Sequence, residues 1–211
     1  MKWKPKYLRK EQKIIFQSFK NLGQMENNDS NSNTYSENES VSKTTARASQ
    51  LMELFENGLK DIYWAEKELT KAIPRMVKNA TSKDLIDALE SHLTETAEQV
   101  VRLEKVFKSI DKPAVAKKCD AMEGLIKEAD EIMKTCEKGV MCDAGIISAA
   151  QKVEHYEMAT YGTLRQFAET LGLIEAESLL EKTLIEEKAT DQKLSQVAKR
   201  AINLEAAHTK A

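Results

Sequence analysis

The sequence has few residues that interrupt regular secondary structure. Its 211 residues include only seven Gly and three Pro. Because Gly and Pro are the strongest helix breakers, their scarcity leaves long stretches in which a helix can continue. Long apolar runs are also missing, since no stretch approaches the roughly 20 apolar residues of a transmembrane helix. With 41% hydrophobic and 31% charged residues, the composition indicates a soluble, helical protein without a membrane span.

Cysteine is scarce as well. The chain has three cysteines, which form no CxxC motif: Cys119, Cys136 and Cys142. A secreted disulfide framework or a structural zinc site would need more of them, at close spacing. We therefore predict reduced, packed thiols in a cytoplasmic protein. A redox or metal-binding role is the alternative, because all three fall between the predicted helical pairs.

The first fifty residues differ from the rest in composition. Residues 1–25 carry a net charge of +6, whereas the remainder carries −8. Residues 26–50 are rich in Asn and Ser and poor in large apolar side chains. Such a segment cannot bury enough surface to order itself, so we predict a disordered tail and linker over residues 1–50. The basic residues 1–25 are interpreted as a solvated tail, with contact to nucleic acid or an anionic surface as the alternative.

Four segments repeat apolar residues at the three- and four-residue spacing of an amphipathic helix. In order, they cover about Ser49–Asn79, about Lys83–Ile110, a stretch that begins near Asp143 or Ala144, and about Glu175–Ala201. The connection between the second and third, residues 114–143, has the spacing of a further short helix. Two hairpins joined by one long crossover form the ferritin-like, antiparallel version of the four-helix bundle. We predict this all-α fold for residues 51–203, followed by a C-terminal tail over 204–211.

Each predicted long helix carries a carboxylate in the middle of its apolar stripe. These positions are Glu66 in the first, Glu95 in the second, Glu154 and Glu157 in the third, and Glu187 and Asp191 in the fourth. In an antiparallel hairpin, two residues lie level when they are equally far from the turn. Glu66 and Glu95 are equally far from the turn predicted near Thr81, and Glu157 and Glu187 from Gly172. The four helices can therefore bring their carboxylates into one layer.

Several ionised carboxylates in one apolar layer would repel one another, which raises their pKa values and costs several kcal/mol. Divalent metal ions remove that cost, and oxygen ligands with an occasional imidazole suit iron or manganese. We therefore predict a metal site for iron or manganese. His92 and Gln99, on the same stripe as Glu95, are weaker candidate ligands. The alternative is that the carboxylates reach solvent or form interhelical ion pairs.

Several segments of the chain resemble the YciF-type family of ferritin-like bacterial stress proteins. They include ELFENGLKDIYWAEKEL, HLTETAEQVVRLEKVF, EHYE with YGTL, and EEKATD, within about residues 51–200. The resemblance implies a ferritin-like bundle, a homodimer, a dinuclear metal site and a role in stress responses. It also implies the ligand set, which is Glu66, Glu95, Glu154 and Glu187, supplemented by Glu157 and Asp191. The chain departs from di-iron proteins in lacking ExxH after Glu95 and Glu187.

Two functions fit these features. The first is an oxidoreductase in which a di-metal site consumes peroxide or oxygen. The second is a non-catalytic stress or interaction protein whose bundle carboxylates are ion-paired or bind a structural metal. We expect a homodimer, no membrane partner, and no nucleic-acid partner except through residues 1–25.

Overall fold

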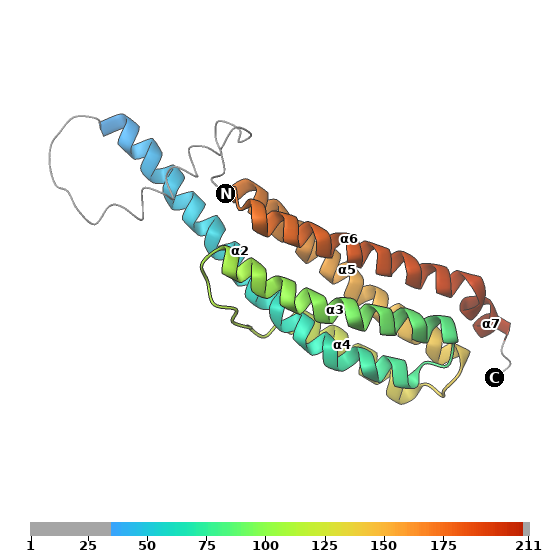
Figure 1. The fold of residues 1–211 in the computed structure, drawn as a ribbon. Helices are drawn as coiled ribbons and strands as arrows, with labels where there is room; N and C mark the ends of the chain where they lie inside the picture. Colours follow the sequence, from blue (N-terminus) through green and yellow to red (C-terminus); the bar gives the residue numbers. More distant parts are fainter. Residues whose placement is uncertain (1–34, 209–211) are drawn as a thin grey trace.

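The computed structural model describes residues 35–208, and within this range every regular element is a helix (Figure 1). The elements are α2 (Tyr35–Asn79), α3 (Lys83–Ser109), α4 (Asp120–Thr135), α5 (Val140–Leu171), α6 (Ile174–Val197), the π-helical turn η1 (Ala198–Ile202) and α7 (Asn203–His208). Helix α2 packs against α3 and α5, and α6 packs against the same two helices. Helix α4 lies in the crossover and packs against α5 and α2. The predicted ferritin-like bundle, with one crossover and an extra short helix, is confirmed.

The stripe that predicted the first helix is the buried face of α2. Its members are at most 2% exposed, and they are Phe55, Leu59, Ile62, Glu66, Leu69, Ile73 and Met76. Helix α2 packs closely against α5 at Gly58, where an added Cβ atom would lie 2.8 Å from Cδ2 of Leu164. The absence of a side chain at Gly58 lets these two helices pack closely.

The hairpin between α5 and α6 ends where the sequence predicts. Gly172 has φ of +72°, a left-handed conformation that strains residues with a Cβ atom. Its N–H donates to the carbonyl of Glu169 at 3.1 Å, and the N–H of Leu173 donates to that of Ala168 at 2.9 Å. These bonds close the end of α5 and turn the chain into α6.

The outer ends of the bundle helices differ from their predicted limits. Helix α2 begins at Tyr35 rather than near Ser49, so it extends into the segment that we interpreted as a linker. No Gly or Pro occurs between residues 24 and 57, so a helix held by its packed part can continue toward the N-terminus. At the other end, η1 and α7 carry the helical path to His208, beyond the predicted end at Ala201. The basic segment 1–25 lies outside the described residues.

Helix α5 begins at Val140, before the predicted start, and Asp143 lies 2% exposed within its first turn. Its carboxylate accepts hydrogen bonds from the backbone N–H groups of Thr81 and Ser82, both at 2.8 Å, and from the Thr81 hydroxyl at 2.7 Å. Ser82 stands at the N-cap of α3 but makes no side-chain cap of its own. Asp143 therefore supplies, from α5, the acceptor that the start of α3 requires.

The prediction of three reduced thiols is wrong for two of them. Cys136 ends α4, Cys142 lies in the first turn of α5, and the two form a disulfide across the short turn between these helices. Their Cα atoms are 5.3 Å apart, within the range that a disulfide spans. Cys119 is a free, buried thiol whose sulfur accepts a hydrogen bond from the N–H of Met122 at the start of α4. Among the described residues, no helix is long and apolar enough to cross a membrane.

Replacing Asp143 with Ala should lower the free energy of unfolding by about 2 kcal/mol, because it leaves two part-buried N–H groups without their charged acceptor. Asp130→Ala is the matched control, since its bond with Arg75 joins two side chains that are about 45% exposed. The control should cost less than about 1 kcal/mol. Urea unfolding of both variants measures the difference. Equal losses would mean that Asp143 does not hold the α2–α3 turn.

Candidate metal centre

Six polar side chains meet in the middle of the bundle, where all four long helices contribute. They are at most 3% exposed, and they are Glu66 from α2, His92 and Gln99 from α3, Glu154 and Glu157 from α5, and Glu187 from α6. Each projects from the apolar face of its helix, as the helical spacing predicts. Four of the six side chains end in carboxyl groups. The other two are the amide of Gln99 and the ring of His92, which lies at the edge of the group.

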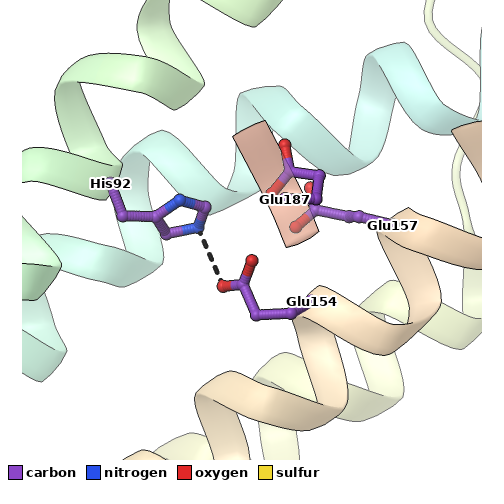
Figure 2. A group of neighbouring side chains, drawn as sticks. All are labelled: His92, Glu154, Glu157 and Glu187. Atoms are coloured by element: carbon purple, nitrogen blue, oxygen red, sulfur yellow. Dashed lines mark ion pairs between the residues drawn. The ribbon is translucent and has the colours of Figure 1, made fainter. Parts of the chain in front are cut away.

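Figure 2 shows how four of these side chains converge from α3, α5 and α6. One ligand atom from each of His92, Glu154, Glu157 and Glu187 lies within 4.8 Å of the others. The ring of His92 points toward Glu154, with Nε2 3.2 Å from Oε1. One nitrogen and several carboxylate oxygens grouped in this way match the ligands that iron and manganese accept in proteins.

Glu66 adjoins this group on the α2 side. Its carboxyl lies close enough to that of Glu157 for the two to interact electrostatically, as the carboxyls of Glu154 and Glu187 also do. The hydroxyl of Tyr161, itself fully buried, donates a short hydrogen bond to Oε1 of Glu66. This bond fixes one oxygen of Glu66 and leaves Oε2 without a partner.

Nine buried side-chain atoms of the described residues have no hydrogen-bond partner, and all nine lie in this group. They are Oε2 of Glu66, both ring nitrogens of His92, Oε1 of Gln99, both oxygens of Glu154 and of Glu157, and Oε2 of Glu187. Buried polar groups are nearly always satisfied, so a concentration of unsatisfied atoms requires an explanation. Metal ions at the centre of the group would satisfy its carboxylate oxygens and one ring nitrogen of His92, which is the fit expected of a metal site.

Burial raises the pKa values of all four carboxyl groups. Repulsion by neighbouring carboxylates adds to this effect for Glu66, Glu154 and Glu157, whose pKa values lie well above the ordinary 4.5. The pKa of Glu187 is raised to about 7, first by burial, and its hydrogen bond with Gln99 offsets this only in part. Without a cation, the group therefore holds protons near neutral pH.

The pKa of His92 moves in the opposite direction, to about 4, because burial disfavours the charged imidazolium. At neutral pH the ring is therefore uncharged and does not neutralise Glu154. An uncharged imidazole has a free lone pair, which is the form that binds metals.

A second layer of polar contacts supports Glu187 from α3. The amide of Gln99 donates to Oε1 of Glu187 and, at 3.2 Å, to Oε2 of Glu186. The guanidinium of Arg102, 5% exposed, pairs with both oxygens of Glu186 at 2.6 and 2.9 Å and donates to the Thr183 hydroxyl at 2.7 Å. Gln99 thus orients a carboxylate through its N–H groups. The sequence did not predict a role for Arg102, although this residue lies three positions after Gln99 and therefore on the same stripe.

Glu95 and Asp191 occupy the edge of the site. Glu95 is partly exposed, and its Oε2 accepts a hydrogen bond from the hydroxyl of Thr190 at 3.3 Å. The side chain of Asp191 is 20% exposed and lies beside His155 on α5. Neither belongs to the group whose ligand atoms lie within 4.8 Å of one another. As metal ligands they stay a prediction.

Comparison with known proteins places the chain in a family. The family described as Domain of unknown function (DUF892) matches residues 50–207. The protein YciF of Escherichia coli (strain K12) is 45% identical over 155 residues, which cover 73% of this chain and 93% of YciF.

Solved structures agree with this placement. The crystal structure of the E. coli stress protein YciF matches with a TM-score of 0.70 at 45% identity, covering 72% of this chain and 97% of that one. YcfI from Rhodopseudomonas palustris matches with a TM-score of 0.68 at 46% identity, covering 70% of this chain and 94% of that one. A protein from Xanthomonas campestris pv. campestris, 21% identical with a TM-score of 0.55, shares the fold over 75% of this chain and 96% of its own. The resemblance found in the sequence is therefore confirmed: this chain belongs to the DUF892 family and is a relative of the E. coli stress protein YciF.

Proposed function

We propose that this protein is a ferritin-like stress-response protein whose buried centre binds two iron or manganese ions and reacts with peroxide or oxygen. The observation that carries this proposal is the set of four fully buried carboxyl groups to which no Lys or Arg of the described residues bonds. Buried carboxylates without a cation are strongly unfavourable. The stress-related part of the proposal comes from its relative, the E. coli stress protein YciF.

The side chains that lie near one another can be assigned to two bound ions. His92, Glu154, Glu157 and Glu187 would hold one ion, because their ligand atoms are grouped together. Glu66 would hold the other ion together with Glu157 and Glu187, because both of these side chains affect the pKa of the Glu66 carboxyl. Bound iron or manganese would supply the change of oxidation state that the consumption of peroxide or oxygen needs.

The protein's own residues prepare the centre for this chemistry. The carboxyl groups give up their protons when a cation arrives, since their raised pKa values reflect burial and mutual repulsion. Tyr161 and Gln99 each fix one oxygen, of Glu66 and Glu187 respectively, and leave the second oxygen free. The complete burial of the group keeps bulk water away from it.

The alternative is a stress or interaction protein without catalysis, in which the centre is ion-paired or holds a structural metal. Ion pairing finds little support, because the nearest basic group is His92 and its pKa of about 4 leaves it uncharged at neutral pH. A structural metal is favoured by one observation, which is that all four carboxyl groups are 0% exposed. Catalytic metal sites keep a position open to substrate.

Metal analysis tests the centre itself. Protein purified without chelator from cells supplied with iron or manganese should contain about two ions per chain. Glu157→Gln should reduce this to less than half, because Glu157 contributes to both assigned positions. Glu98→Gln, on the exposed side of α3, is the control and should keep the full content. Elemental analysis of the three proteins gives the answer, and wild-type protein free of both metals would refute the proposal.

The pH dependence of stability tests the buried carboxyls. A group whose pKa is higher in the folded state than in the unfolded state binds more protons when the protein is folded. The free energy of unfolding therefore falls as pH rises from the pKa of the unfolded state through the pKa of the folded state. For Glu187 this range runs from 4.5 to about 7. His92, whose pKa falls from 6.5 to about 4, adds stability as pH rises between these values, so above pH 6.5 only the carboxyl effect remains.

We therefore expect the melting temperature of metal-free protein to fall by about 5 °C between pH 6.5 and 8. Mn²⁺ should abolish this fall, and Glu157→Gln should reduce it. Scanning calorimetry of metal-free and Mn²⁺-loaded protein makes the measurement. A melting temperature that is independent of pH and Mn²⁺ would show that the carboxyls carry no such penalty.

Turnover separates the catalytic proposal from the structural-metal alternative. Iron- or manganese-loaded protein should consume hydrogen peroxide at least about tenfold faster than metal-free protein, since the metal supplies the redox change. Glu157→Gln should match the metal-free rate. An oxygen electrode and a peroxide assay follow the reaction. Full metal content without turnover of peroxide or oxygen would favour the structural role.

A further inference from the structure

An ion bound in the centre must first pass a closed wall of side chains, because Glu66, Glu154, Glu157 and Glu187 are 0% exposed. Along the seam between α5 and the end of α6 the surface is hollowed into a groove of about 610 Å³. Its α5 wall includes residues from Ala144 to His155, and its other wall comes from Ala198 in η1 and Asn203 in α7. π-Helical turns such as η1 are frequent at functional sites.

The groove reaches a pair of side chains that can bind a metal. Nε2 of His155 lies 3.3 Å from Oδ1 of Asp191, and the amide of Gln151 donates to the same oxygen at 3.1 Å. Both His155 and Gln151 line the groove. The His155 side chain is 67% exposed and that of Asp191 is 20% exposed, so water and ions can reach them. Imidazole and carboxylate together form a donor set for divalent transition metals.

This pair lies next to the buried centre. His155 follows Glu154 in α5, and Asp191 is one helical turn beyond Glu187 in α6. Both oxygens of Glu154 are buried and without a hydrogen-bond partner. The charge of Asp191 also contributes to the raised pKa of Glu154, after burial and the closer Glu187. The pair is therefore adjacent in sequence, through His155, to an unsatisfied carboxylate, that of Glu154, which feels the charge of Asp191.

Lys152 lines the groove, and its ammonium group is paired with Oε1 of Glu128 at 2.6 Å. The carboxylate of Asp191 does not line the groove, but it contacts the lining residues His155 and Gln151 and so places a negative charge beside this recess. Such a charge concentrates counter-ions and raises their rate of association.

We propose that His155 and Asp191 form an outer site that captures a divalent transition-metal ion from the groove and passes it inward to Glu154 and Glu187. The route inward rests on the function proposed above for the buried centre. Its role is kinetic, since the outer site sets how fast the centre fills and not how many ions it holds. The outer site also assigns a role to Asp191, which lies outside the group of converging ligand atoms.

Glu98 offers a comparison on α3. It is exposed, it does not line the groove, and it does not belong to the group of converging ligand atoms. Glu98→Gln removes one negative charge, as Asp191→Asn does, without touching the groove or the centre.

The rate of Co²⁺ uptake by metal-free protein, followed by stopped-flow absorbance, tests the proposal. Asp191→Asn and His155→Ala should each slow uptake by about tenfold and leave the number of tightly bound Co²⁺ ions in the centre unchanged. Glu98→Gln should slow it less than about twofold. Wild-type rates in the first two variants, or equal slowing by Glu98→Gln, would overturn the outer site.

A second measurement keeps this proposal separate from the buried centre. In Glu157→Gln/Glu187→Gln protein the two ligands common to both inner positions are lost while their shape is kept, and a titration with Co²⁺ should find one weakly bound ion. Adding His155→Ala should abolish that binding. If wild-type protein fills no inner centre but the double variant binds this ion, the proposed function fails and the outer site stands. If the double variant binds no His155-dependent ion, the outer site fails whatever the wild type binds.

Discussion

The energetic cost of carboxyl groups inside a dry helical bundle is the constraint on which the rest of this structure depends. Four of them are fully buried, and an uncharged imidazole is the only basic side chain of residues 35–208 that pairs with them. Burial and mutual repulsion raise the pKa values of Glu66 and Glu154 among them, so without metal the group keeps protons and carries less than its full charge. Full ionisation would leave four negative charges, which two divalent cations balance. Arg102 changes this little, because its own charge is paired with Glu186.

The fold can contain such a layer because its stability comes from elsewhere. On α2, apolar side chains continue the buried stripe on both sides of Glu66, with Ile62 before it and Leu69 after it. The ends of the bundle are fixed separately, by Asp143 at the α2–α3 turn and by the left-handed Gly172 at the α5–α6 turn. A polar middle between apolar layers and fixed ends holds ligands in place without contributing to the hydrophobic core.

Helical periodicity predicted the fold and which face of each helix is buried. It predicted less precisely how deeply each carboxylate on that face is buried. Glu66, Glu154, Glu157 and Glu187 are buried, whereas Glu95 and Asp191, on the same stripes, lie at the edge. A stripe is about 100° wide, and a side chain near its margin reaches the seam between two helices rather than the centre. Position along a stripe follows from spacing, while position across it depends on how neighbouring helices pack.

Other features depend on contacts between distant segments, which spacing cannot indicate. Asp143 carries the sequence signal of a helix start, yet its carboxylate binds another turn of the chain. The bond between Cys136 and Cys142 required knowing that α4 ends and α5 begins within one short turn. Helix α2 begins early because a packed helix extends into a segment that lacks breakers, despite its polar composition.

The position of the single imidazole affects how firmly the centre would hold metal. Gln99 uses its N–H groups to hold Glu187, so the position one turn beyond Glu95 supplies orientation in place of a nitrogen ligand. The nitrogen comes instead from His92, one turn before Glu95 and on the side of Glu154. A centre with four carboxylates and one imidazole is rich in oxygen, and oxygen ligands select less strongly among divalent metals than imidazoles do. Weaker selection makes the metal supply and the route of uptake more important. An outer site with its own imidazole, at His155, would then contribute the preference for transition metals that the inner oxygens lack.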